Sequence, residues 1–178
     1  QRFRDVPGFE LYSSYCIYRE SGLRNAALAS LREFIGSVRN LSAAEQRRIA
    51  RELCQIGYTE RDVIGLIPKP LASFLLDVLD KWLAEDRSEP AVWAWLALLS
   101  NDRSHYYRGL HLHPNDQTLL TGAIHTALDE AAFQMHHVQD GGFIGDTEDA
   151  AAAIALAAEY ALRLDASDQK RSIISEIS

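Results

Sequence analysis

Six histidines, all in the second half of the chain, are the residues with the most evident potential for chemistry. His136 and His137 precede a glycine-rich segment that also holds carboxylate and aromatic side chains. His125 lies eleven residues before His136, so on a helix the two would share one face about three turns apart. Converging imidazole and carboxylate groups can hold a metal ion or transfer protons. The candidate site is the set His125, His136, His137, Asp140, Phe143 and Asp146.

Three interpretations of this histidine-rich site stay open. Metal binding or acid–base catalysis needs several converging ligands, and the chain has no His-Glu-x-x-His spacing. Histidines near the end of a helix also interact favourably with the helix dipole and bond free carbonyls, which is a structural role. The third interpretation is contact with a ligand or partner. The structural role is favoured, and no metal or other cofactor is expected.

Trp95 is a further candidate for partner binding. It follows Trp93 by two residues, so on a helix the two side chains point about 200° apart. Both can be buried only if the helix is sandwiched between neighbours. An exposed tryptophan would be a binding anchor, because aromatic side chains dominate interface energetics. Burial of both in the core is the preferred interpretation.

Other patterns are rejected as sites. Gly141, Gly142 and Gly145 precede a helix, as in a phosphate loop, but no strand comes before them and nearby acids would repel phosphate. No serine, threonine or cysteine stands beside a base in a recognisable nucleophile motif. Cys16 and Cys54 are expected to be buried free thiols in a reducing compartment.

Apolar residues recur at helical spacing through the chain, and no alternating run predicts a strand. In the first half, Leu23 is expected to face inward, Ser42 and Glu45 to form a capping box, and Gly57 to end a helix. In the second half, Pro114 is expected to open a long helix. The predicted helices cover residues 9–20, 23–38, 42–56, 71–84, 90–100, a short segment after a turn at 101–104 that contains Tyr106, Tyr107 and Leu110, 114–137, 147–164 and 168–177.

The stretch from Trp93 to Pro114 resembles a tetratricopeptide repeat. Trp93 is followed by Leu96-Ala97, then Tyr106, Gly109 and Pro114, which is the order of large, small and terminating residues in that family. A second match starts at Gly145, and a third, weaker one starts at Tyr18. The stretch is about two helical turns short of the full repeat. The resemblance implies a stack of antiparallel helical hairpins and, as is common in the family, binding of a protein or peptide.

Composition restricts the function further. Residues 1–81 carry 12 basic and 10 acidic groups, whereas residues 82–178 carry 6 and 15. The acidic second half argues against nucleic-acid binding. No apolar run is long enough to span a bilayer, and the N-terminus present has no signal-peptide core. We expect one all-α domain over residues 1–178, with eight or nine helices, in the cytoplasm.

The sequence therefore predicts a bacterial-type interaction module without catalytic activity, whose partner is another protein. A toxin-neutralising immunity protein is the first alternative, since a small acidic chain suits a stoichiometric inhibitor of a basic toxin domain. The second alternative is a small metal-dependent hydrolase centred on His125, His136, His137 and Asp146.

Overall fold

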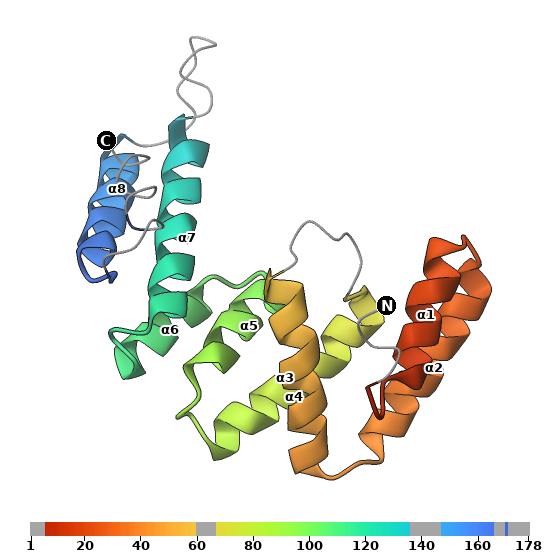
Figure 1. The fold of residues 1–178 in the computed structure, drawn as a ribbon. Helices are drawn as coiled ribbons and strands as arrows, with labels where there is room; N and C mark the ends of the chain where they lie inside the picture. The colour runs from red at the N-terminus through yellow and green to blue at the C-terminus, as the bar shows by residue number, and fades with distance from the viewer. Residues whose placement is uncertain (1–5, 60–66, 136–146, 166–169, 171–178) are drawn as a thin grey trace. The chain divides into compact units, whose positions relative to one another are not determined.

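The computed structural model describes residues 6–59, 67–135, 147–165 and 170. This part of the chain is all-α, as the sequence predicts, and contains no strand (Figure 1). The chain divides into two compact units, residues 1–86 and 87–178, each of which is described by itself. The helices of unit 1 are α1 (Glu10–Glu20), α2 (Arg24–Arg39), α3 (Ala43–Thr59) and α4 (Lys69–Glu85). Those of unit 2 are α5 (Pro90–Ser100), α6 (Ser104–Leu112), α7 (Gln117–Met135) and α8 (Thr147–Leu162).

An aromatic cluster holds the α1–α2 hairpin of unit 1 together. The rings of Phe9 and Tyr12 lie 5.9 and 5.5 Å from that of Phe34, and all three side chains are buried. The prediction that Leu23 faces inward is wrong, because its side chain is 54% exposed. Leu23 belongs to the turn before α2, where its amide donates to the Tyr18 carbonyl (2.8 Å), so it does not follow the helical stripe.

Helix α3 begins with the Ser42 half of the predicted capping box and ends later than predicted. The Glu45 amide donates to Ser42 Oγ (3.3 Å), which satisfies one free amide of the first turn. The prediction that Gly57 ends the helix is wrong, since α3 continues to Thr59. A glycine ends a helix when it takes the left-handed conformation. Gly57 instead allows a close approach: a Cβ there would stand 2.6 Å from Ile67 Cδ1.

Helix α4 agrees closely with its prediction. Pro70 lies in the first turn, where a missing amide hydrogen costs nothing. Large apolar residues that recur at helical spacing in this helix are all buried: Leu71, Phe74, Leu75, Val78, Leu79 and Trp82. Residues 60–66, between α3 and α4, lie outside the described residues.

In unit 2, α5 is buried on nearly all sides. Trp93 and Trp95 are only 8% and 3% exposed, so the preferred interpretation of both as core residues is confirmed. Within unit 2 the helix contacts both α6 and α7, which cover part of its surface. It ends at Asn101, which adopts the left-handed conformation (φ 57°) that asparagine tolerates well.

The prediction that Pro114 opens the long helix is wrong by one turn. Asp116 caps α7 instead, because its Oδ1 accepts the Leu119 amide (2.9 Å). Pro114 belongs to the preceding turn, which is closed by a bond from the Asp116 amide to the His113 carbonyl (3.1 Å). The buried apolar residues of α7 are Leu119, Leu120, Ala123, Ile124, Ala127 and Ala131, whereas Leu128 is half-buried.

Helices α7 and α8 form an antiparallel hairpin. At one end, the Asp165 amide donates to Gln117 Oε1 (2.9 Å), and Arg163 donates to the Pro114 carbonyl. Alanines Ala150, Ala157 and Ala161 are buried, and their small side chains permit close helix packing. Lys170 Nζ donates to the Leu164 carbonyl (2.7 Å), just beyond α8. The predicted helix 168–177 falls, apart from Lys170, outside the described residues.

Candidate functional site

Two of the seven residues that the sequence predicts as a site are described by the structure. His125 is exposed on α7, and Trp95 is buried in α5, where it is not an accessible anchor. The other five lie outside the described residues: His136, His137, Asp140, Phe143 and Asp146. The convergence expected of this group is therefore neither confirmed nor contradicted.

The joint between α5, α6 and α7 depends on two glycines. A Cβ at Gly109 would lie 2.8 Å from Trp93 Cβ and 2.9 Å from Leu119 Cδ1. A Cβ at Gly122 would lie 2.1 Å from Tyr106 Cε1. All three distances are shorter than any relaxed carbon–carbon contact, so glycine at both positions is what lets these helices approach. Gly109, the small residue of the tetratricopeptide-like pattern, therefore lies at a helix–helix contact.

Buried polar atoms accompany this joint. Trp93 Nε1 and His105 Nδ1 are buried without a hydrogen-bond partner among the described residues, and the two rings lie 6.3 Å apart. The other imidazole nitrogen, His105 Nε2, lies 3.7 Å from an Asp102 carboxylate oxygen. A polar, buried location of this kind is where an ordered water would be bound. We assign the pair to the architecture of the joint.

Contacts between α6 and α7 define how far α6 covers its neighbour. Gly109 of α6 contacts Leu119 of α7, and Tyr106, one turn earlier in α6, contacts Gly122, one turn later in α7. Arg103, just before α6, reaches α7 about one turn beyond Gly122. Arg103 bonds the Thr126 carbonyl (3.4 Å) and Asp129 Oδ2 (3.0 Å). The two helices are therefore antiparallel, and coverage by α6 ends near Asp129.

Phe133 lies four residues beyond Asp129 and is 72% exposed. It follows Gly122 by eleven residues, about three helical turns, so it continues the face that α6 covers earlier in α7. Sequence reasoning did not identify Phe133 as a site residue. The available signal was its absence from the inward apolar stripe of α7, since an aromatic residue off that stripe must be exposed or covered by something else.

Acidic side chains surround the same end of the α7–α8 hairpin. The antiparallel pairing places the first turn of α8, with Glu148 and Asp149, at the end where α7 carries Asp129 and Glu130. All four are exposed. From Gly109 to Leu162 the sequence holds eight Asp and Glu residues and no Lys or Arg. The chain from α7 to α8 therefore contributes to the negative field of unit 2.

The arginine cluster of α3, formed by Arg47, Arg48 and Arg51, makes its contacts within unit 1. The guanidinium groups of Arg47 and Arg51 lie 5.6 and 5.2 Å from the Trp82 ring centroid, within the range of a cation–π interaction. Arg47 also pairs with Glu85. Arg48 pairs with Glu45 one turn away (3.3 Å). These contacts give the cluster a structural role within unit 1.

The remaining polar groups form no metal site in the part of the chain that the structure describes. There, no three His, Cys, Asp or Glu side chains are grouped so that they could hold an ion. Cys16 and Cys54 are both free thiols, the first half-buried and the second buried. His113 Nε2 lies 2.8 Å from the Arg87 carbonyl, which ties the α6–α7 turn to the start of unit 2.

None of the described helices is both long and apolar enough to cross a membrane. Comparison of the chain with protein-family models, with curated proteins and with solved structures gives no match.

Proposed function

We propose that this chain is a protein-interaction module without catalytic activity, built from tetratricopeptide-like helical hairpins. The observation that carries the proposal is Phe133, a large aromatic side chain that is exposed among acidic residues at one end of the α7–α8 hairpin. Aromatic residues of this kind supply much of the binding energy of protein interfaces. Two free thiols suit a reducing compartment, so we place the module in the cytoplasm.

The charge distribution favours a second candidate, an immunity protein that neutralises a toxin. Unit 1 has 12 basic and 12 acidic residues, whereas unit 2 has 6 and 13, so the whole net charge of −7 belongs to unit 2. An acidic surface accelerates association with a basic partner through long-range attraction. An inhibitor needs only to cover the toxin's active surface, which requires no catalytic residues of its own.

Affinity capture tests the proposal. The full chain is immobilised and exposed to a lysate of its source organism, beside the variants Phe133→Ser and Leu162→Ser. Leu162 is the matched control because it is similarly exposed (78%) but lies at the opposite end of the hairpin. We expect one stoichiometric partner that the wild type and Leu162→Ser retain and Phe133→Ser loses.

The captured protein is then purified and titrated calorimetrically against the wild type. A 1:1 complex with a basic toxin-like domain, with inhibition of its activity at equimolar ratio, would select the immunity candidate. If no protein is enriched above the bare resin, the interaction proposal fails.

A further inference from the structure

The α7 face that lies beyond α6 carries the exposed ring of Phe133. Helix α7 has 19 residues and α6 has 9, so α7 is about 28 Å long and α6 about 13 Å. The coverage traced above ends at Arg103 and Asp129. Phe133 lies about 6 Å further along the α7 axis. A helix placed there would extend the packing that α6 begins.

The charges around this face determine which partner it suits. Asp129 and Glu130 lie within the last two turns of α7, and Glu148 and Asp149 lie in the first turn of α8. Arg103 pairs with Asp129, and Gln134 donates a hydrogen bond to Glu130. Unit 2 as a whole carries 6 basic and 13 acidic residues, so its net charge is negative. An acidic partner would be repelled, whereas a basic one would be attracted and oriented.

We propose, on the basis of the function proposed above, that this face binds a basic amphipathic helix of a partner protein. The apolar side of that helix covers Phe133, in line with α6, and its lysines or arginines lie against Glu130 and Asp149. Recognition by helix packing requires an apolar anchor together with a charged rim that sets register, and this end of unit 2 supplies both.

The test uses a synthetic amphipathic helix of leucine and lysine, and the same peptide with glutamine in place of lysine. Binding to the full chain is measured by fluorescence anisotropy at low and at physiological salt. The wild type should bind the lysine peptide more tightly than the glutamine peptide, and added salt should reduce that preference.

Matched variants locate the binding. Phe133→Ser and Glu130→Lys should each weaken binding of the lysine peptide by roughly tenfold or more. Leu162→Ser and Glu159→Lys likewise replace an apolar side chain with serine and a glutamate with lysine, but toward the other end of the hairpin. Their affinity for the lysine peptide should stay within about twofold of the wild-type affinity. Circular dichroism confirms that every variant is folded.

Two peptide outcomes would overturn the inference. An equal loss in all four variants would mean diffuse attraction to an acidic protein, and no loss in any of them would mean that the peptide binds elsewhere. A concentration-dependent dimer that Phe133→Ser abolishes, seen by sedimentation, would make a second copy of this chain the occupant instead.

The result is separable from that of the proposed function. If Phe133→Ser still captures the cellular partner, the interaction function stands and this site is wrong. If the peptide distinguishes the variants but no cellular partner is captured, the site stands and the function fails.

Discussion

Gly122 of α7 lies against the ring of Tyr106 in α6, so closely that a methyl group on Gly122 would stand 2.1 Å from Tyr106 Cε1. Replacing this glycine with alanine would gain about 1 kcal/mol of helix propensity. The added carbon would also force the buried ring out of place, and overpacking of this kind costs about 1–3 kcal/mol. We expect Gly122→Ala to lower the free energy of unfolding, measured by urea titration.

Gly36→Ala is the matched control. Gly36 lies within α2, and a Cβ there would have no atom within 4 Å. This variant should raise the free energy of unfolding by about 0.5–1 kcal/mol, because alanine restricts the unfolded chain and favours the helix. Equal stabilisation by both substitutions would show that α6 and α7 are not in tight contact at Tyr106.

The cap of α7 gives a second prediction. Asp116 Oδ1 accepts the Leu119 amide, so Asp116→Ala leaves that amide without its partner and should cost about 1 kcal/mol of stability. Asp116→Asn keeps an accepting oxygen and should recover most of the loss. Asn115→Ala is the control, because the hydrogen bond that Asn115 makes in the turn uses its backbone carbonyl, which alanine retains. Thermal unfolding of the three variants, followed by circular dichroism, distinguishes a cap from a general effect of the turn.

Alkaline pH should destabilise unit 1. Burial raises the pKa of the Cys54 thiol to about 12. It also raises the pKa of the Tyr12 phenol and, to the extent that its ring is buried, the pKa of the Tyr15 phenol. The folded state therefore keeps protons that the unfolded state releases first. Stability is then full below about pH 9 and falls as pH rises toward the folded pKa values, by up to about 1.4 kcal/mol per pH unit for each group.

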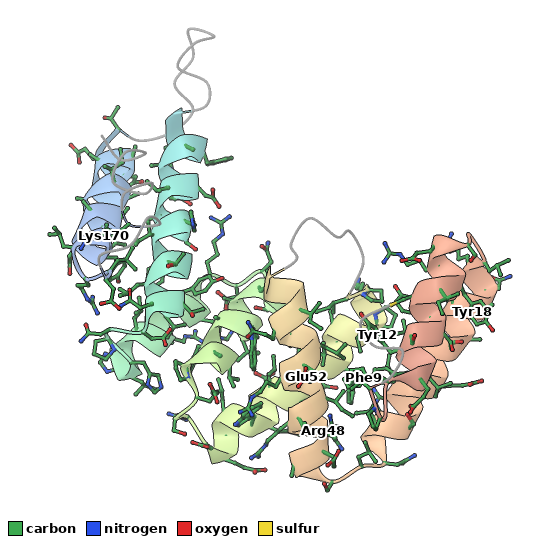
Figure 2. All side chains as sticks on the ribbon, viewed as in Figure 1. Phe9, Tyr12, Tyr18, Arg48, Glu52 and Lys170 are labelled. Carbon is green, nitrogen blue, oxygen red and sulfur yellow. The ribbon has the colours of Figure 1, made fainter. Side chains whose placement is uncertain are left out.

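Tyr12→Phe tests the origin of that loss. The variant lacks the most strongly buried phenol, so its stability should fall less steeply between neutral and strongly alkaline pH than that of the wild type. Tyr18→Phe is the matched control because Tyr18 is exposed on the same helix (Figure 2). If both variants follow the wild-type pH curve, Tyr12 does not contribute to the alkaline loss.

Much of the fold could be predicted from apolar periodicity. The buried faces of α4 and α5 follow from spacing alone, because large apolar residues at helical intervals have few other ways to leave water. Single residues at helix ends were less reliable. Gly57 and Pro114 are compatible with several local conformations, and tertiary contacts with Ile67 and the cap at Asp116 decided between them.

The candidate site was less predictable than the fold. Histidines are predicted as site residues because their chemistry is recognisable in a sequence, whereas Phe133 is one apolar residue among many in the sequence. Its exposure depends on where α6 stops covering α7, and that depends on contacts made by Gly109, Tyr106 and Arg103. A tertiary relationship of this kind has no signature in local spacing.

Metal binding through His125 provides the last prediction. His125 is exposed on α7, and Asp129, the carboxylate one turn further on the same face, is engaged by Arg103 at 3.0 Å. A zinc ion using both side chains would have to displace that ion pair. We therefore expect the purified chain to hold much less than one equivalent of zinc by elemental analysis. Its melting temperature should be unchanged by added zinc or by a chelator, since a bound ion would stabilise the folded state.

His111→Ala, at another exposed histidine, is the control for His125→Ala. One tightly held equivalent of zinc that His125→Ala loses and His111→Ala keeps would favour the metal-dependent hydrolase over the interaction module.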